Sequence, residues 1–486
     1  MLNLKDPTLF KQQACIAGAW VDADSGETVA VTNPATGERL GTVPMCGTAE
    51  TVRAIAAADT AQKQWRNVPA KERAAILRKL NDLMLANVDD LALIMTSEQG
   101  KPLAEAKGEI AYAASFIEWF ADEARRVYGD TIPATSNDKR ILALKQPVGT
   151  TAAITPWNFP TAMLTRKAGP ALAAGCSMVV KPATQTPFSA LAFAVLAERA
   201  GVPKGLLAVL TGSASQIGGE MTRSPIVRKL SFTGSTEVGR TLMRQSADTI
   251  KKLSLELGGN APFIVFDDAD IDAAVDGAMV SKYRNTGQTC VCANRLYVQR
   301  GVLQAFTDKL VAKVKALKVG NGLEAGVTQG PLIDAKAVAK IEEHIADARA
   351  KGGEVLTGGK RHALGGLFFE PTVIGGATAA MLFAKEETFG PLAPIFAFDT
   401  EAEVIELAND SEFGLAAYFY SRDIGRVMRV AEQLESGIVG VNTGLISTAE
   451  APFGGVKQSG LGREGSKYGL DDFLEIKYVC LGGLDT

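Results

Sequence analysis

The sequence predicts an α/β protein built on mostly parallel, doubly wound sheets. From Gly149 to Gly259, short apolar runs of strand length alternate with runs whose apolar residues recur at helical spacing. A second series of the same kind follows Pro262. Strands that alternate with helices form parallel sheets, and ligands bind at the carboxyl ends of their strands. The 486 residues are enough for two or three domains.

The segment before Gly149 has a different pattern. Residues 15–44 alternate polar and apolar side chains around Ser-Gly and Thr-Gly turns, which predicts hairpins. Residues 48–128 carry apolar side chains every three or four positions, which predicts helices that Gly100, Lys101 and Pro102 interrupt. Residues 130–148 are expected to form an extended excursion that ends in a strand.

Each α/β series has its own set of predicted elements. In the first series, strands are expected in TTAAITPW, SMVVKPA, GLLAVLTG, SPIVRKLSFTG and KKLSLELGG, with helices in RKAGPALAAG, PFSALAFAVLAERAG and STEVGRTLMRQSA. In the second series, strands are expected in APFIVFDDAD, RLYVQ, EVLTGG, FFEPTVI and APIFAFD, with helices over 271–282 and 302–316. GIVGVNTG, a glycine-rich stretch over 454–465 and a closing strand in DFLEIKYVCL complete the chain.

The composition argues against several classes of protein. The formal charge of −3, with no run of Lys and Arg, provides no basic field for nucleic acid. Charged or polar residues interrupt every apolar stretch before it reaches the length of a membrane span, and the first residues lack the apolar core of a secretory signal. The six cysteines are scattered, which favours free thiols in a reducing cytoplasm.

The scarcity of histidine restricts the chemistry. The only two histidines, His344 and His362, lie in an amphipathic helical pattern and in a Gly-flanked loop, and we expect both on the solvated surface. A Cys-His or Ser-His hydrolase is therefore disfavoured, and no Cys/His group has the spacing of a zinc site. A general base in this protein has to be a carboxylate or a lysine.

A candidate nucleophile lies in the segment YRNTGQTCVCANR. Gly287 permits a tight turn that presents the thiol of Cys290, and neighbouring donors or charges would have to favour its thiolate. The polar residues around it are awkward to bury together, as in a functional loop. The alternative is a buried structural cysteine.

Polar residues follow the first two predicted strands of the parallel series. Asn158, in PWNFP, offers amide N–H donors of the kind that a developing oxyanion requires, although it would also suit a rigid, capped turn. Lys181 and Thr184 end the next strand, where a dinucleotide fold places the adenosine ribose. A cation and a hydroxyl there, in place of a carboxylate, favour NADP over NAD. A strand-end lysine in solvent is the alternative.

Three further segments carry candidate site residues. Gly234 and Ser235 join a strand to a helix, and Ser235 as N-cap leaves N–H groups for a pyrophosphate. Glu256, between two leucines and before two glycines, is a carboxylate whose pKa apolar surroundings would raise, unless it faces solvent. Glu387 can accept ribose hydroxyls, with Phe389 beside it, unless the segment is only a loop before a strand. The formal GxGxxG at 460–465 has too little chain after it for a βαβ unit.

Together these segments resemble the aldehyde dehydrogenase superfamily. PWNFP, KPA, FTGSTEVG, LELGGNAP, GQTC, EETFGP and PFGGVKQSGLGRE occur in that family's order, and the resemblance covers essentially the whole chain. More narrowly, SFIEWFADEARRVYGDTIP, ITPWNFPTAMLTRKAGPALAAGC and NTGQTCVCANR are similar to bacterial NADP-dependent succinate-semialdehyde dehydrogenases. The resemblance implies a Rossmann-like cofactor domain (1–129 and 150–257), a catalytic domain (258–445) and a β extension for oligomerisation (130–149 and 466–486).

The resemblance also implies a role for each candidate residue. Cys290 would be the nucleophile, Asn158 and the Cys290 backbone N–H the oxyanion hole, and Glu256 the base that activates water. Lys167 and Glu464 would belong to a proton path. NADP, with NAD possible, would be lined by a set of seven residues: Trp157, Lys181, Thr184, Gly234, Ser235, Glu387 and Phe389. A thiohemiacetal on Cys290 would lose hydride to the nicotinamide and leave a thioester, which water would hydrolyse. The family commonly forms dimers and tetramers.

The implied substrate carries a distal carboxylate, as succinate semialdehyde does. In the resembling group, two arginines and a serine that match Arg166, Arg284 and Ser447 hold this carboxylate, although the two arginines could equally be surface charges. Glutarate semialdehyde, another carboxylated aldehyde or a broader aldehyde range are the alternatives. Glu256 argues against acyl transfer to coenzyme A, and retention of Cys290, Glu256 and Asn158 argues against a catalytically idle relative. Cys292 could form a regulatory disulfide with Cys290 or pack as a small residue.

Overall fold

An eight-stranded sheet forms the centre of the larger lobe, with the strand order β2-β1-β9-β8-β7-β10-β11-β21 in the computed structural model, which describes residues 2–484. Five neighbouring strands are parallel, and antiparallel strands extend both edges. The parallel strands are β7 (Thr150–Ile154), β8 (Ser177–Lys181), β9 (Leu207–Val209), β10 (Val227–Thr233) and β11 (Lys252–Glu256). The antiparallel strands are β1 (Ala14–Ile16), β2 (Ala19–Val21) and β21 (Gly460–Leu461).

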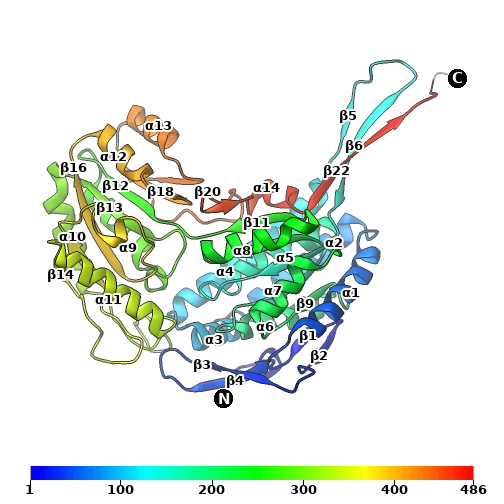
Figure 1. The fold of residues 1–486 in the computed structure, drawn as a ribbon, viewed down its shortest axis with the longest axis horizontal. Coiled ribbons are helices and arrows are strands. Elements are labelled where there is room, and N and C mark those ends of the chain that lie inside the picture. Colours follow the sequence, from blue (N-terminus) through cyan, green and yellow to red (C-terminus); the bar gives the residue numbers. More distant parts are fainter. Residues whose placement is uncertain (1, 485–486) are drawn as a thin grey trace.

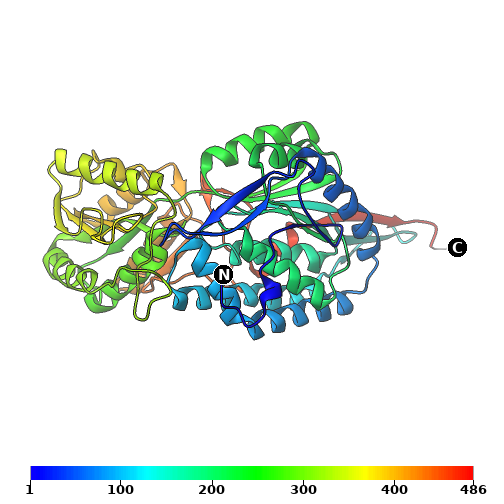
Figure 2. The same cartoon turned by 90° about the horizontal axis from the view of Figure 1, so that it is seen from below.

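Helices cover both faces of this sheet (Figure 2). They are α1 (Thr48–Trp65), α2 (Ala70–Ala86), α3 (Val88–Gln99), α4 (Leu103–Glu123), α5 (Ala162–Ala174), α6 (Pro187–Ala200), α7 (Ala214–Arg223) and α8 (Thr236–Ser246). Helix α7 was not predicted from the sequence, because it has few apolar residues. Asn87 separates α2 from α3 within one predicted helical run, and Gly100, at φ +96°, ends α3. An antiparallel ribbon of β3 (Thr28–Thr32) and β4 (Arg39–Pro44) confirms the hairpin prediction.

A seven-stranded sheet forms the second lobe, in the order β14-β15-β16-β13-β12-β18-β19. All its neighbours are parallel except β14 and β15. The strands are β12 (Ala261–Val265), β13 (Ala293–Gln299), β14 (Glu354–Thr357), β15 (Thr372–Gly375), β16 (Leu392–Phe398), β18 (Ala416–Tyr420) and β19 (Ile438–Val441). The helices are α9 (Ile271–Tyr283), α10 (Leu303–Lys315), α11 (Ala335–Ala350), α12 (Glu401–Asn409) and α13 (Ile424–Gln433). Thus both predicted parallel series are confirmed.

A three-stranded antiparallel arm projects from the larger lobe and contains the C-terminal strand (Figure 1). It consists of β5 (Asp130–Ile132), β6 (Arg140–Pro147) and β22 (Leu474–Leu481), which follows the short helix α14 (Ser466–Asp471). Ile476 and Tyr478 on β22 are 74% and 66% exposed. Large apolar side chains with such exposure mark a surface that another protein surface can cover.

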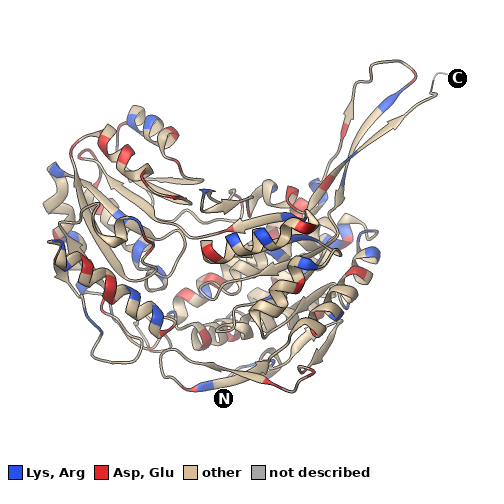
Figure 3. Cartoon of the chain, viewed as in Figure 1, with Lys and Arg blue, Asp and Glu red and all other residues tan. Residues whose placement is uncertain are grey.

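Positions of Lys and Arg and of Asp and Glu are interspersed along the outer helices of the two lobes (Figure 3). None of the helices in the described part of the chain combines the length and the apolar character needed to cross a membrane.

Candidate active site

One cavity is lined both by residues at the carboxyl edge of the first sheet and by residues at the amino edge of the second. Its volume is about 230 Å³. Strands β7, β10 and β11 end beside it, and β12 and β13 begin beside it. The lining includes seven of the fifteen predicted site residues: Trp157, Asn158, Gly234, Ser235, Cys290, Glu387 and Phe389. The prediction that ligands bind at the carboxyl ends of strands therefore fits the first sheet. The second sheet instead lines the cavity with residues at its amino edge.

Close backbone packing places Cys290 at this edge. An added Cβ at Gly259 would lie 2.5 Å from the carbonyl oxygen of Cys290, so only glycine permits this approach. Gly287, at φ +73°, approaches the carbonyl of Gly390 in the same way. The loop that carries Cys290 is thus packed between the segments 258–260 and 386–391. Most of its polar side chains are buried, and the amides of Asn285 and Gln288 each donate to the backbone carbonyl of the other, which offsets part of the cost of burying them.

The Cys290 thiol faces Glu256. Sγ lies 3.7 Å from Oε2 of Glu256, and the thiol donates to the carboxylate. Glu256 is 3% exposed, and burial raises its pKa to about 7, as the sequence analysis expects. Burial, followed by the negative charge of Glu256, raises the pKa of Cys290 well above its ordinary value. The surroundings therefore favour the neutral thiol, and a base such as Glu256 has to remove its proton.

Asn158 lies on the loop after β7 and is 5% exposed. Its Nδ2 donates to the carbonyl of Gln288, two residues before the nucleophile, at 3.0 Å. The amide has two N–H groups, so one N–H is left for an oxygen atom in the cavity. The oxyanion-hole arrangement is chemically feasible at this position.

Lys167 and Glu464 form a buried ion pair behind the cavity. Nζ of Lys167 contacts Oε1 of Glu464 at 2.5 Å and donates to Oγ1 of Thr233 at 2.6 Å. Burial raises the pKa of Glu464, but Lys167 and Arg166 lower it by more, so the net direction is downward. The two predicted proton-path residues are thus in direct contact.

The arginines predicted to hold a substrate carboxylate have different environments. Arg166 is 1% exposed, its Nε lies 2.9 Å from Oε2 of Glu464, and its guanidinium stacks 3.7 Å from the centroid of Phe453. Its Nη2 has no hydrogen-bond partner within residues 2–484. Arg284 is half-buried and lies 5.3 Å from the ring centroid of Phe159. Arg166 is therefore not a surface charge, whereas Arg284 keeps part of its surface in solvent.

Tyr112 of α4 is a neighbour of these arginines that the sequence analysis missed. Burial raises its pKa, against the opposing charges of the nearby Arg166 and Arg284, and Ser447 lies close to its hydroxyl. The hydroxyl is buried, with no well-formed hydrogen bond to any described residue. An unsatisfied buried hydroxyl near two guanidinium groups suits a ligand that carries acceptor oxygens.

Lys181 and Thr184 are adjacent at the end of β8, where Nζ of Lys181 donates to Oγ1 of Thr184 at 3.3 Å. Lys181 is 4% exposed, and burial lowers its pKa to about 8. A phosphate beside it would stabilise the charged form. Ser235 caps α8, since its hydroxyl accepts from the N–H of Val238 at 3.4 Å, and the free N–H groups of that helix begin at the cavity.

Glu387 and Phe389 reach the cavity from the loop before β16. The N–H of Gly259 donates to Glu387 at 3.2 Å, and burial raises the pKa of Glu387 to about 8. Phe389 has φ +53°, a strained value for an aromatic residue. Its ring contacts that of Trp157 edge to face, with centroids 5.6 Å apart.

The expectation for His344 is wrong. Its side chain is fully buried on α11, and Nδ1 lies 3.1 Å from Oγ1 of Thr388, between Glu387 and Phe389. Burial lowers the pKa of His344. The helical pattern alone did not show that a second loop covers this face of α11.

Four polar residues around the α3–α4 turn were also missed: Gln99, Lys101, Glu105 and Glu109. All four make hydrogen bonds to the loops that carry Asn158 and Cys290. The sequence does contain a signal, because Glu105 and Glu109 stand four residues apart on one face of an Ala-rich helix.

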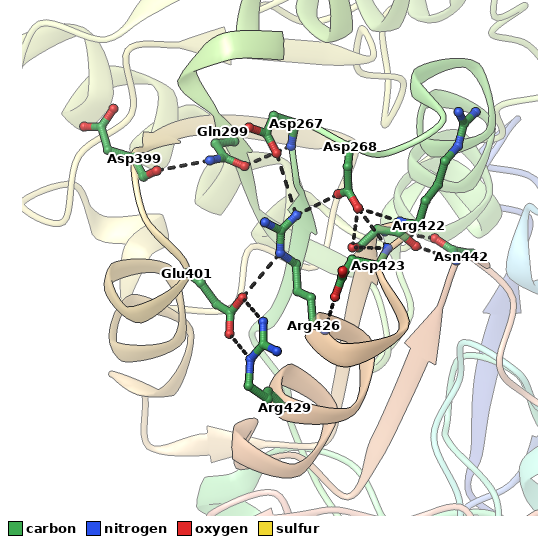
Figure 4. Close-up of polar contacts among 11 residues, drawn as sticks. Asp267, Asp268, Gln299, Asp399, Glu401, Arg422, Asp423, Arg426, Arg429 and Asn442 are labelled. Atoms are coloured by element: carbon green, nitrogen blue, oxygen red, sulfur yellow. Dashed lines mark hydrogen bonds and ion pairs between the residues drawn. The ribbon is translucent and has the colours of Figure 1, made fainter.

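At the carboxyl edge of the second sheet, the residues that follow β12, β16 and β18 are joined by ion pairs and hydrogen bonds (Figure 4). Asp268, after β12, accepts from the Ser421 hydroxyl, from the N–H groups of Arg422 and Asp423, and from Arg426, whose Nη1 lies at 2.8 Å. Glu401 pairs with both Arg426 and Arg429. This network joins strand ends to helix starts, and the residues that make it are already paired.

Cys292 is buried, and Lys282 Nζ donates to its sulfur at 3.4 Å and to Oδ1 of Asn294 at 3.1 Å. Both Cys290 and Cys292 are free thiols. The regulatory disulfide stays a prediction.

Comparison with known proteins agrees with this geometry. Residues 20–479 match the model of the aldehyde dehydrogenase family. The chain is 70% identical to glutarate-semialdehyde dehydrogenase of Pseudomonas aeruginosa, over 99% of this chain and 100% of that protein, and 66% identical, with the same coverage, to the NADP⁺ succinate-semialdehyde dehydrogenase of Escherichia coli K12. The crystal structure of succinate-semialdehyde dehydrogenase from Burkholderia pseudomallei matches with a TM-score of 0.98 at 68% identity, over 99% of this chain and 100% of that one. The resemblance and the fold predicted from the sequence are confirmed, and the chain belongs to the aldehyde dehydrogenase family.

Proposed function

We propose that this protein oxidises succinate semialdehyde to succinate with NADP⁺. The observation that carries the proposal is the contact between the Cys290 thiol and the Glu256 carboxylate, in a cavity that Asn158 also lines. A thiol, a base and an amide donor around one cavity suit nucleophilic attack on a carbonyl. The names of the Pseudomonas aeruginosa and Escherichia coli relatives, at 70% and 66% identity, support a carboxylated aldehyde as substrate.

The protein's own residues account for the acyl-transfer steps. Glu256 takes the thiol proton, and the sulfur of Cys290 adds to the aldehyde carbon. Asn158, through its second N–H, and the backbone N–H of Cys290 hold the oxygen of the resulting thiohemiacetal. After oxidation to the thioester, Glu256 accepts a proton from the water that attacks it. The ion pair of Lys167 and Glu464 carries the thiol proton away from Glu256 before this second transfer, and the water proton away after it.

The residues at the first sheet fit a dinucleotide with a 2′-phosphate. Lys181 and Thr184 supply a cation and a hydroxyl at the end of β8, and the start of α8 supplies free N–H groups for a pyrophosphate. Glu387 would accept ribose hydroxyls, and Trp157, Gly234 and Phe389 would line the cavity. When bound, NADP⁺ supplies the hydride acceptor.

The proposed substrate carboxylate would meet Arg166, Arg284 and Ser447. Arg166 is held by Glu464 and Phe453, and its Nη2 is free of partners among the described residues. Arg284 rests on Phe159. Tyr112 would add its hydroxyl between them. Charge-assisted hydrogen bonds of this kind are roughly twice as strong as neutral ones.

Glutarate semialdehyde is the second candidate substrate. The relative at 70% identity carries that name, and its substrate is one methylene longer than succinate semialdehyde. A single methylene changes discrimination by only about 1–3 kcal/mol. The same site can therefore serve both chain lengths with different efficiency.

We also propose the division into a cofactor-binding part (1–129 and 150–257), a catalytic part (258–445) and an oligomerisation arm (130–149 and 466–486). The separate sheets and the exposed apolar residues of the arm support it, with a second copy of the chain as partner in a dimer or tetramer. The cytoplasmic location stays a prediction.

One steady-state comparison tests the substrate and cofactor together. We expect kcat/KM for succinate semialdehyde to exceed that for butanal. We also expect kcat/KM with NADP⁺ to exceed that with NAD⁺. Including glutarate semialdehyde separates the two candidate substrates. A preference for butanal would contradict the role of the arginines.

A further inference from the structure

The turn between α3 and α4 holds two loops that carry the chemistry. One is the loop of Asn158, in the larger lobe, and the other is the loop of residues 284–288 that leads to Cys290, next to the second lobe. Three side chains that the reaction itself does not use make the contacts. Lys101 lies in the turn, Glu109 lies on α4, and Asn285 lies on the second loop and links it to the first.

Lys101 fixes the backbone of Asn158. Its Nζ donates to the Asn158 carbonyl at 2.7 Å and to Oε2 of Glu109 at 2.5 Å, and it lies 3.8 Å from the ring centroid of Phe159. The side chains of Lys101 and Glu109 are both 0% exposed. A buried ammonium group needs hydrogen-bonding and charged partners such as these. Moving it away from them would leave a buried charge unpaired, which costs free energy.

Glu109 fixes the other end of the same loop. Its Oε1 accepts from the N–H groups of Thr161 and Ala162, at 3.1 and 3.2 Å, where α5 begins. The carboxylate satisfies two of the N–H groups that every helix start leaves unpaired. Lys101 and Glu109 thus hold the chain on both sides of Phe159 and Pro160.

Asn285 connects this loop to the nucleophile loop. Its Nδ2 donates to the carbonyls of Asn158 and Gln288, at 3.0 and 3.1 Å, and its Oδ1 accepts from Gln99 at 3.0 Å. Its backbone N–H donates to Glu105 at 2.8 Å, and its φ is +51°. Such a conformation persists only where surrounding contacts hold it.

We propose that Lys101, Glu109 and Asn285 form an inter-loop clamp that sets the position of the Asn158 amide relative to Cys290. The proposal rests on the oxyanion role proposed for Asn158 and makes the three side chains positioning residues, which act through Asn158 rather than on the substrate. The carbonyl of Asn158 accepts hydrogen bonds from the side chains of Lys101 and Asn285. The carbonyl of Gln288 accepts hydrogen bonds from the side chains of Asn158 and Asn285. These shared acceptors leave the amide little freedom to rotate or shift.

Two clamp variants test this, each compared with a matched control. Lys101→Met with Glu109→Met removes both charges together, which avoids leaving one buried and unpaired. Asn285→Gly removes the bridging amide and keeps a backbone that tolerates positive φ. The control is Lys251→Met, because Lys251 is also a buried lysine that donates to backbone carbonyls, those of Met221, Ser224 and Val227, away from the cavity.

The first measurement is the pre-steady-state burst of reduced cofactor with butanal, which does not depend on the carboxylate site. We expect the burst rate to fall about tenfold to hundredfold in both clamp variants, as a displacement near 1 Å costs about that much, and to stay unchanged in Lys251→Met. Alkylation of Cys290 by iodoacetamide is expected to keep its rate in all variants, because displacement at a saturated carbon forms no oxyanion.

The second measurement repeats the burst in an Asn158→Ala background. If the clamp acts through Asn158, adding Lys101→Met and Glu109→Met there costs no further burst rate. The proposal is overturned if the clamp variants burst as fast as the wild type, if burst and alkylation fall together, or if the losses multiply in the Asn158→Ala background. A wild-type protein that forms no reduced cofactor from succinate semialdehyde or butanal would instead contradict the proposed function.

Discussion

The sulfur of Cys290 lies 3.7 Å from Oε2 of Glu256, although the strands next to these two residues belong to different sheets. Glu256 ends β11 of the first sheet, and Cys290 precedes β13 of the second. Since burial and Glu256 together raise the pKa of the thiol, this carboxylate is positioned to act twice, first on the thiol and then on water.

Replacing Glu256 with glutamine is expected to stall turnover and to slow the burst of reduced cofactor near neutral pH. A positioned base contributes about 10²–10⁴-fold, and the amide cannot accept the thiol proton. The burst should recover as pH rises, because the thiol then ionises without help. Stopped-flow measurements across pH check this.

The matched control is Glu98→Gln. Glu98 is another fully buried glutamate, with a pKa that burial raises to about 8, but it accepts from the N–H groups of Phe188 and Ser189 away from Cys290. It should keep a normal burst. A full-rate burst in Glu256→Gln at pH 7 would show that another group deprotonates Cys290.

Arg284→Leu is expected to raise KM for succinate semialdehyde about 10- to 100-fold and to leave KM for butanal unchanged. Loss of a hydrogen bond to a charged group costs about 1.5–3 kcal/mol, which corresponds to that range. Arg284 is preferred to Arg166 for this test, because removing Arg166 would also leave Glu464 without one of its partners.

Arg240→Leu is the control, since Arg240 pairs with Glu412 on the surface. Steady-state kinetics with both aldehydes measure the two KM values in each variant. An equal rise in KM for butanal would assign Arg284 a structural role instead of a role toward the carboxylate.

The preference for NADP⁺ over NAD⁺ is expected to weaken as pH rises through about 8. Burial lowers the pKa of Lys181 to about 8, so its charge is present below that pH and is lost above it. The apparent KM for NADP⁺ should therefore increase between pH 7 and 9, whereas that for NAD⁺ should not. In Lys181→Gln, the apparent KM for NADP⁺ should no longer increase over this pH range. If the increase remains in that variant, a residue other than Lys181 contacts the 2′-phosphate.

His344 is expected to make the folded protein less stable in mild acid. Burial and Lys340 lower its pKa, against the opposing effect of Glu386, so the unfolded chain binds the proton more readily. The stability is fully present above about pH 6.5 and declines as pH falls below it, by about 1.4 kcal/mol for each unit of pKa difference.

Urea unfolding at pH 5.5 and 7.5 measures this decline, which should be smaller in His344→Gln. His362→Gln is the control, because His362 lies in a loop where its Nδ1 only accepts from the N–H of Leu364. The same decline in both variants would show that other groups cause the acid sensitivity.

Strand and helix positions were predictable where the side-chain period was clear. β7, β8 and β10 follow apolar runs, and Pro156, Pro182 and Gly234 after them mark the turns to the next helix. Helix α7 was missed because its polar composition, SASQIGGEMTR, hides the few residues that it buries. His344 was misplaced because α11 has an amphipathic pattern, and the loop of Thr388 covers part of it.

The sequence by itself determined the two parallel series and the identity of the residues around Cys290, because local periodicity and turn chemistry are properties of neighbouring residues. Only the tertiary structure decided that the amino edge of the second sheet meets the carboxyl edge of the first, and that Lys101 and Glu109 hold the Asn158 loop. Contacts such as Cys290 to Glu256 and Arg166 to Glu464 join residues far apart in the chain. Their geometry follows from how whole layers pack, which no local pattern encodes.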